Sequence, residues 1–326
     1  MQMKAAIQTG NRVEIQSVAR PRPGPNDILT RNRMAALNRA DLGMAAGRSH
    51  GTQGGAGSLL GLEWAGEVVE VGTNVTRFAP GDQVMCSGLG GFAQYAVADY
   101  RRVFPLPTGG MGWKDASTLP VALRTMHDAL ILNGTMAKGE SVLIRGASSA
   151  VGLMGLQIAR EMGAGIILGT STSAEKLDRL AGFGATGTVN TQAPGWGDQV
   201  LSATNGRGVD LVIDMLSGPD TNETLRATAI GGRIVNVGRL AGQNANFDFD
   251  LHALRRIKYI GVTFRTRSAA EVGVISEAVE RDLWQALSAG RLRLPIDRVM
   301  PLDQTASALG EMAANTHFGK IVLDCT

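Results

Sequence analysis

The sequence predicts an α/β protein in which a β-rich part is followed by a doubly wound parallel sheet. Short strand-like runs separated by Gly, Pro and Asp make up most of the chain before residue 120. From residue 141 onward, strand-like runs alternate with helical patterns, which is typical of βαβ units. The chain also holds 43 glycines, and these suit the many tight strand-to-helix turns of such a sheet.

The expected elements follow in chain order. The β-rich part should contain strands at Met3–Gln8, Gly66–Val71 and Gln83–Met85, with a turn at Pro80-Gly81-Asp82. In the alternating part, strands are expected at Ser141–Arg145, Gly165–Thr170, Val209–Met215, Gly232–Val237 and Tyr259–Phe264, and helices at Val151–Met162 and Ala174–Phe183. Crossovers between parallel strands are right-handed, so the sheet should be doubly wound. A last run, Ile321–Leu323, is expected to return to the β-rich part.

Size and charge bound the function. A chain of 326 residues suggests two domains. The net charge is +3 and no basic run is long enough to follow a phosphate backbone, so nucleic acid is not expected as a partner. No window holds about eighteen uninterrupted apolar residues, and the first residues lack a signal peptide's apolar stretch. Cys86 and Cys325 form no CxxC pair. These features predict a cytoplasmic protein with free thiols and no membrane span.

A small-residue turn between a strand and a helix predicts a dinucleotide site. The spacing is Gly146-x-x-Ser149-x-x-Gly152, with Gly155 three residues further on. Small residues let backbone N–H groups approach a pyrophosphate closely, and the helix N-terminus adds favourable partial charge. Ser149, Ala150, Val151 and Gly152 are therefore candidate cofactor-binding residues. The alternative is a strand-to-helix turn that binds no ligand.

The end of the second strand favours NADPH over NADH. An NAD site usually has Asp or Glu there, bonded to the ribose 2′-hydroxyl. This chain has no acid at that point and offers the hydroxyls of Ser171, Thr172 and Ser173, with Lys176 one turn later. A hydroxyl and a cation suit a 2′-phosphate. The alternative is that Ser173 only caps a helix on which Lys176 is solvated.

With these residues in place, the whole chain resembles the medium-chain dehydrogenase/reductase superfamily, and within it the zinc-independent quinone oxidoreductases. The motifs that carry the resemblance are Leu37-Asn-Arg-Ala-Asp-Leu42, Gly61-Leu-Glu-Trp-Ala-Gly-Glu-Val-Val-Glu-Val-Gly72, Phe78-Ala-Pro-Gly-Asp-Gln-Val84, Gly208-Val-Asp-Leu-Val-Ile-Asp214 and Phe318-Gly-Lys-Ile-Val-Leu323. The resemblance implies a GroES-like β-rich catalytic domain over 1–123 and 266–326. It also implies a Rossmann NADP-binding domain over 124–265. Relatives form homodimers through the edge of the Rossmann sheet, which the apolar run Tyr259–Phe264 would suit.

The resemblance also implies that no zinc is bound. Zinc-dependent members carry a Cys near the position of Asn38 and a His where this chain has Leu62. Thiolate and imidazole are the ligands that a catalytic zinc needs, and Asn and Leu do not replace them. The four-cysteine lobe of structural zinc is missing too, because only Cys86 falls in that region.

By resemblance, the site residues come from several segments. Asn38 would line the nicotinamide and donate a hydrogen bond to an acceptor carbonyl, although a loop-capping role is the alternative. Asp41 is expected to cap a helix. His50 is the better candidate for a proton donor, ahead of His127, and it stands in a loop where relatives often have Tyr. The remaining cofactor-binding candidates are Thr125, Gly238, Phe264, Arg265 and Lys320.

The function expected from all of this is NADPH-dependent hydride transfer to a quinone. The nearest alternative is reduction of an α,β-unsaturated carbonyl or an enoyl thioester on the same scaffold. A further alternative is a non-catalytic NADPH-binding protein, since the loop around His50 lacks the usual aromatic side chain.

Overall fold

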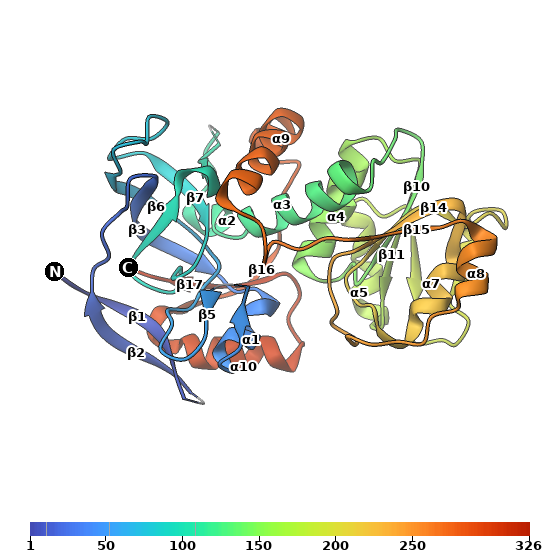
Figure 1. Cartoon of the computed structure of the whole chain (residues 1–326), viewed down its shortest axis with the longest axis horizontal. Helices are drawn as coiled ribbons and strands as arrows, with labels where there is room; N and C mark the ends of the chain where they lie inside the picture. Colours follow the sequence, from blue (N-terminus) through green and yellow to red (C-terminus); the bar gives the residue numbers. More distant parts are fainter. Residues whose placement is uncertain (11, 52, 108) are drawn as a thin grey trace. The chain divides into compact units, whose positions relative to one another are not determined.

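The chain folds into two compact units. The computed structural model describes residues 1–326 except 11, 52 and 108. The first unit comprises Met1–Val121 and Phe264–Thr326, and the second comprises Ala122–Thr263 (Figure 1). The catalytic role of the first unit and the cofactor role of the second stay predictions.

The first unit is built around a mixed sheet in which most neighbouring strands are antiparallel. The strand order is β16 (Ile296–Pro301), β17 (Lys320–Asp324), β3 (Asp27–Ala36), β6 (Glu63–Val71), β7 (Gln83–Ser87) and β9 (Val103–Pro105), and β8 (Tyr95–Asp99) also pairs with β3. Two hairpins stand apart from this sheet: β1 (Gln2–Thr9) with β2 (Arg12–Ala19), and β4 (Ser49–His50) with β5 (Gln53–Gly54). The expected final strand thus joins this sheet as β17.

Several short helices and one helix of 20 residues, α9, accompany these strands. They are α1 (Arg39–Ala45), η1 (Tyr100–Arg102), α2 (Trp113–Ala116), α3 (Pro120–His127), α9 (Ala269–Ser288), η5 (Leu302–Gln304) and α10 (Thr305–Ala314), with α3 running across the boundary into the second unit. The core between the sheet and the helices is apolar, and Leu37, Trp64 and Phe92 are fully buried in it.

The second unit holds a six-stranded, wholly parallel sheet. Its order is β12 (Gly187–Asn190), β11 (Ile166–Ser171), β10 (Ser141–Arg145), β13 (Val209–Asp214), β14 (Thr228–Asn236) and β15 (Lys258–Gly261). Counted from β10 this is 3-2-1-4-5-6, the Rossmann order, in which the chain changes direction between β10 and β13. The predicted α/β class is confirmed, and β10 and β13 lie next to each other at the point where such sheets bind ligands.

Helices surround this parallel sheet, as Figure 1 shows for α4, α5, α7 and α8. Their bounds are η2 (Asp128–Asn133), α4 (Ala150–Glu161), α5 (Ala174–Asp178), η3 (Leu180–Phe183), α6 (Gly197–Ala203), η4 (Gly218–Asp220), α7 (Thr221–Ala227) and α8 (Phe249–Arg255). Every residue of β10 is buried, as expected of a central strand covered on both faces.

Several expected strands differ from the structure in their bounds, two of them in the parallel sheet by three residues or more. The run expected at 232–237 begins earlier, as β14, at Thr228. The run expected at 259–264 is wrong beyond Gly261, where β15 ends. The reason is pairing: β15 lies at the sheet edge with β14 as its neighbour, and the last paired residue of β14 is Asn236, opposite Gly261. The N–H of Val262 still donates to the Asn236 carbonyl at 3.0 Å, and the strand ends there because β14 itself ends at Asn236.

Among the described residues, no helix is long and apolar enough to cross a membrane.

Candidate active site

The turn after β10 is held by hydrogen bonds to the end of β11. Gly146 has a φ of 78°, a conformation that glycine adopts without strain. Its N–H donates to Thr170 Oγ1 at 3.0 Å, and the N–H of Ala147 donates to the Thr170 carbonyl at 2.9 Å. Ser149 then caps α4, since its Oγ accepts from the Gly152 N–H at 3.1 Å and donates to the Gly146 carbonyl at 2.9 Å.

Gly152 is needed to close this turn. A Cβ there would lie 2.6 Å from both Ala147 Cα and the Gly146 carbonyl oxygen, which is closer than a carbon can approach. Ser149 is exposed while Ala150 and Val151 are partly exposed. The N–H groups in the first turn of α4 have no intrahelical acceptor, and they lie where the helix N-terminus stabilises an anion. The turn therefore fits a pyrophosphate.

The serine hydroxyls at the end of β11 form hydrogen bonds within the second unit. Ser171 is buried, and its Oγ lies 3.1 Å from Ser148 Oγ and accepts from the Ser173 N–H at 3.2 Å. Ser173 caps α5, since its Oγ accepts from the Lys176 N–H at 3.3 Å. The capping alternative for Ser173 is thus present, and it is compatible with phosphate binding. The Lys176 side chain is half-buried next to it.

A buried ion cluster beside the turn escaped sequence reasoning. Arg145, the last residue of β10, pairs with Asp214 at 3.2 Å and with Asp220 at 3.1 Å, and its side chain is fully buried. Asp214 Oδ1 in turn accepts from the N–H groups of Leu216 and Ser217. The cluster therefore joins the turn that follows β10 to the turn that follows β13. Only the register of the two strands, opposite each other at Arg145 and Asp214, brings these charges together.

Two further expected cofactor residues lie in the second unit. Gly238 follows β14, and a Cβ there would lie 2.4 Å from the Met215 carbonyl oxygen, so a side chain would push the two turns apart. Its own carbonyl accepts from Ser217 Oγ at 2.8 Å. Thr125 on α3 is partly exposed, whereas its neighbours on both sides are buried. It is therefore a position on α3 from which a hydroxyl reaches solvent or a ligand.

In the first unit, Asn38 lies in a buried polar cluster. Lys320 Nζ donates to Asn38 Oδ1 at 2.8 Å, to the Leu37 carbonyl at 3.0 Å and to Glu63 Oε1. Asn38 Nδ2 donates to Glu63 Oε1 at 3.0 Å and reaches the Ala36 carbonyl at 3.4 Å. Asn38 is 7% exposed and Lys320 2%. Both ends of the Asn38 amide are thus engaged inside the protein.

Asp41 completes the cluster from α1. Its Oδ2 accepts from the Asn38 N–H at 2.7 Å, which is the capping contact expected of it. Burial raises the pKa of Asp41 to about 7; the Asn38 N–H and the Lys320 charge act in the opposite direction, and the Glu63 charge raises the pKa further. Asp41 therefore gains a proton at a much higher pH than an exposed aspartate does.

His50 lies beside Arg265. Burial, and after it the Arg265 charge, lower the pKa of His50 below its ordinary value of 6.5. The hairpin touches the same segment at Gly51, where a Cβ would lie 2.1 Å from the Arg265 carbonyl oxygen. Phe264 precedes this arginine and faces the guanidinium of Arg267 at 5.4 Å. The structure therefore brings His50 next to the segment that holds Phe264 and Arg265, while Asn38 lies in the buried cluster.

Of these groups, sequence reasoning missed Glu63 as well as the Arg145 cluster. Glu63 stands in a motif that was recognised, yet its partner Lys320 follows 257 residues later. The usable signal was a pair of charged residues inside apolar strand sequences, because such charges are rarely buried unless they are paired. Among the described residues, no group of three or more His, Cys, Asp or Glu is arranged to hold a metal ion.

Two family models match this chain. The model described as alcohol dehydrogenase GroES-like domain matches residues 24–108, and the one described as zinc-binding dehydrogenase matches residues 150–280. The chain belongs to the medium-chain dehydrogenase/reductase family. The predicted fold and the resemblance to the quinone oxidoreductase-like members of that family are thereby confirmed.

This chain covers very different shares of the length of its relatives. Quinone oxidoreductase-like protein 2 of Bos taurus is 27% identical over 93% of this chain and 86% of that protein. The solved quinone oxidoreductase of Pseudomonas syringae superposes with a TM-score of 0.85 and 25% identity, over 99% of this chain and 100% of that one. A mycocerosic acid synthase-like polyketide synthase of Mycolicibacterium smegmatis is 29% identical over 96% of this chain. The chain spans only 15% of that synthase.

Proposed function

We propose that this protein is an NADPH-dependent, zinc-independent oxidoreductase that passes a hydride to a quinone. The observation that carries the proposal is the turn from Gly146 to Gly152, whose capped helix and small residues fit a pyrophosphate. The likeness to quinone oxidoreductase-like proteins over nearly the whole chain supports the choice of acceptor.

The end of β11 supports NADPH rather than NADH. No acidic side chain stands at Ser171 or in the next three positions, so no carboxylate is placed to bind a ribose 2′-hydroxyl or to repel a 2′-phosphate. Lys176 and the hydroxyls of Ser171 and Ser173 supply a cation and donors of the kind that a phosphate takes.

Hydride transfer asks the protein mainly for binding and orientation. The nicotinamide supplies the hydride when it is bound. In the second unit, Thr125 and Gly238 are the proposed contacts toward it. In the first unit, the lowered pKa leaves His50 a neutral imidazole near pH 7, so that it donates one hydrogen bond to the acceptor and is not a cationic acid. Phe264 and Arg265, in the segment that contacts the hairpin of His50, are proposed as further cofactor contacts.

Zinc independence is supported by the chemistry of the donors. Asn38 and Leu62 supply neither thiolate nor imidazole. The Asn38 carboxamide oxygen also already accepts a hydrogen bond from Lys320. A cation bound there would have to displace the ammonium of the same chain.

Reduction of an activated alkene is the second candidate. It is favoured by the polyketide synthases among the relatives, which match this chain over almost its whole length. The same turn and the same hydride would serve, and only the acceptor differs. The two candidates are separated by a panel of simple quinones, α,β-unsaturated ketones and enoyl thioesters, with NADPH consumption as the readout. Turnover confined to the alkenes would reverse the order, and no turnover with any of them would leave NADPH binding without catalysis.

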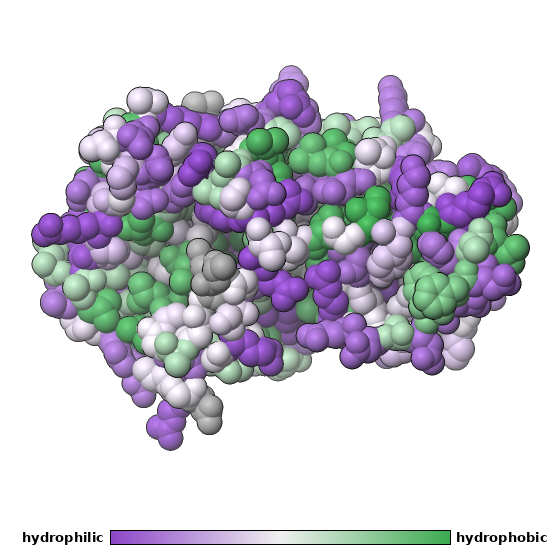
Figure 2. All heavy atoms as spheres, viewed as in Figure 1, coloured by the Kyte–Doolittle hydropathy of each residue, from purple (hydrophilic) through white to green (hydrophobic). Residues whose placement is uncertain are grey.

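We also propose a homodimer, formed along the edge of the parallel sheet. β15 is an edge strand, and large apolar side chains near it are exposed: Phe249 is 76% exposed, Leu254 66% and Tyr259 40%. Figure 2 shows hydrophobic side chains gathered around the α8 region. A pocket of about 700 Å³, lined among others by Phe247, Phe249 and Tyr259, lies in the same region. The outer edge of β15 has no neighbouring strand in its sheet, and exposed apolar side chains lie next to it. Pairing with a second copy would cover both. Cys86 and Cys325 are buried and not joined in a disulfide, which suits the reducing cytoplasm that we propose as the location of the enzyme.

A further inference from the structure

The ammonium of Lys320 uses all its hydrogen-bonding capacity inside the first unit. A lysine has three N–H donors, and here they meet Asn38 Oδ1, the Leu37 carbonyl and Glu63 Oε1. Lysine side chains usually carry their charge to solvent, but this one is 2% exposed. A phosphate group would have to draw the ammonium away from three oxygen atoms to bind it.

Glu63 likewise uses both of its carboxylate oxygens for hydrogen bonds inside the first unit. Its Oε1 accepts from Lys320 and Asn38, and its Oε2 accepts from the N–H of Val121 at 2.8 Å. Its side chain is fully buried. If Lys320 turned toward a cofactor, Glu63 would remain buried without its counter-charge, and such a charge is strongly destabilising.

The ion pair fixes which way the Asn38 carboxamide faces. The amide oxygen faces the ammonium of Lys320, and the amide nitrogen faces the carboxylate of Glu63. Rotating the amide by half a turn would place its N–H groups against the ammonium and its oxygen against the carboxylate. Both contacts would become repulsive, so the two charges select a single orientation.

We propose that Lys320 and Glu63 are positioning residues that hold the Asn38 carboxamide in place, and that Lys320 does not bind the cofactor. The proposal rests on the proposed function in one respect: hydride transfer must occur, with Asn38 near the acceptor as the family resemblance implies. It replaces the expected cofactor contact of Lys320 by an indirect role through Asn38.

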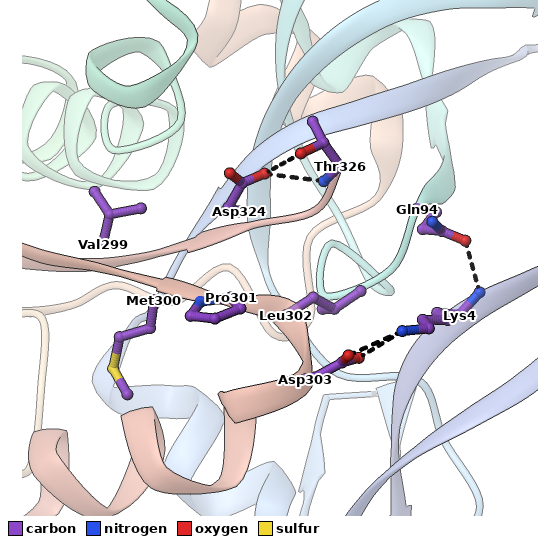
Figure 3. Close-up of a pocket in the computed structure, with 9 residues that line it drawn as sticks. All are labelled: Lys4, Gln94, Val299, Met300, Pro301, Leu302, Asp303, Asp324 and Thr326. Atoms are coloured by element: carbon purple, nitrogen blue, oxygen red, sulfur yellow. Dashed lines mark hydrogen bonds and ion pairs between the residues drawn. The ribbon is translucent and has the colours of Figure 1, made fainter.

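The first test separates positioning from cofactor binding. NADPH is titrated into the full-length wild type, Lys320→Met and Lys320→Met/Glu63→Gln, with ligand fluorescence as the readout. The matched control is Lys4→Met, which removes an exposed ion pair with Asp303 at 2.8 Å (Figure 3). We expect the NADPH dissociation constant of the double variant to stay within about 2-fold of wild type. Loss of a charged phosphate contact would raise it by about 10-fold or more, and that result would overturn the proposal.

Thermal unfolding tests the ion pair itself. Lys320→Met leaves a buried carboxylate and should lower Tm by roughly 6–12 °C, whereas Lys320→Met/Glu63→Gln removes both charges and should recover more than half of that loss. Lys4→Met should change Tm little, because exposed pairs contribute little. A double variant no more stable than Lys320→Met would contradict a mutual pair. A wild type that binds no NADPH would overturn the proposed function, and this unfolding comparison would still decide on the ion pair.

The role through Asn38 has its own signature in the kinetics. Asn38→Ala and Lys320→Met/Glu63→Gln should each lower kcat for NADPH-dependent turnover with little change in KM for NADPH. The triple variant should be no slower than the slower of the two, since all three changes remove the same oriented amide. Additive losses in kcat, or losses that appear in KM for NADPH, would show that Lys320 and Glu63 act in another way.

Discussion

Gly152 shows how a single missing side chain shapes the cofactor turn. Sequence reasoning assigned this glycine to close approach of a pyrophosphate, and the structure adds that a Cβ would first meet Ala147 and Gly146 at 2.6 Å. Gly152→Ala should therefore distort the turn and raise the NADPH dissociation constant by 10-fold or more (about 1.4 kcal/mol for each factor of ten). Titration of the folded variant, checked by circular dichroism, measures the effect.

The control for this prediction is Gly182→Ala in η3 of the same unit. A Cβ at Gly182 meets nothing within 4 Å, so this variant should bind NADPH like wild type. An unchanged affinity in Gly152→Ala would remove the turn as the phosphate site.

Lys176 is the residue on which the choice of cofactor depends. A charge-assisted hydrogen bond to the 2′-phosphate contributes roughly 1.5–3 kcal/mol, so Lys176→Ala should raise the NADPH dissociation constant by about 10- to 150-fold. NADH has no such phosphate, and its affinity should barely change. The effect should shrink between low and physiological salt, because a partly exposed charge is screened. Lys138→Ala, at an exposed position of the same unit, is the control. If both cofactors bind the Lys176 variant as they bind wild type, the lysine has no role in the choice.

Asp41 makes the stability of the first unit depend on pH. Its pKa is raised from 3.8 to about 7 in the folded protein, so the folded state holds a proton that the unfolded state loses above about pH 4. Because the folded state binds more protons in this window, the free energy of unfolding should fall as pH rises from about 4 to 7 and level off above 7. Asp41→Asn cannot ionise and should lack this decline, while the surface variant Asp303→Asn should keep it. Denaturant unfolding from pH 4 to 8 measures the difference. Parallel curves for wild type and Asp41→Asn would show that Asp41 is ionised throughout.

At the scale of elements, local sequence patterns predicted the strands and helix caps that depend on interactions between residues close in the sequence. The strand at Ser141–Arg145 lies where its unbroken apolar pattern placed it, and Ser149 caps α4 because a serine before a helical pattern supplies the missing acceptor. The expected end of β15 was wrong because Tyr259–Phe264 is largely apolar and so resembles one continuous strand, whereas pairing with β14 ends the strand at Gly261.

The sequence predicted only the part of the candidate site that is formed by a local motif. The turn at 146–152 is such a motif. The buried clusters are not. Arg145 meets Asp214 because β10 pairs with β13, and Lys320 on β17 meets Glu63 on β6 although β3 lies between these strands in the sheet. No periodicity in the sequence reports which charged residue of an apolar strand will find a partner.

The edge strand β15 and helix α8 carry the prediction about assembly. Phe249 is 76% exposed, and a charge there should prevent the pairing of two copies along this edge. Phe249→Glu should therefore elute as a monomer in size-exclusion chromatography with light scattering, where wild type elutes as a dimer. Val274→Glu changes a side chain of similar exposure on α9, in the other unit, and should stay dimeric. A monomeric wild type would contradict the proposed homodimer, and a dimeric Phe249→Glu would move the interface elsewhere.

At the scale of the whole molecule, we propose that the second unit binds the nucleotide, whereas the first unit has an internal ion pair as its polar centre. The parallel sheet holds the turn proposed for NADPH, and the polar cluster of the first unit contains a buried lysine and carboxylates without cysteine or histidine. In this proposal the cofactor supplies the hydride, and the reaction needs no metal ion. It predicts an enzyme whose rate depends on which nicotinamide cofactor is present and is indifferent to chelators.

The most direct test is steady-state consumption of NADPH and of NADH with a simple quinone, measured on the purified wild type with and without a metal chelator. We expect the protein to consume NADPH, with kcat/KM for NADPH exceeding that for NADH by about 10-fold or more. The chelator should change neither the rate with NADPH nor the rate with NADH. A protein that consumes neither cofactor, that uses both equally, or that loses activity to the chelator and regains it with zinc would contradict it.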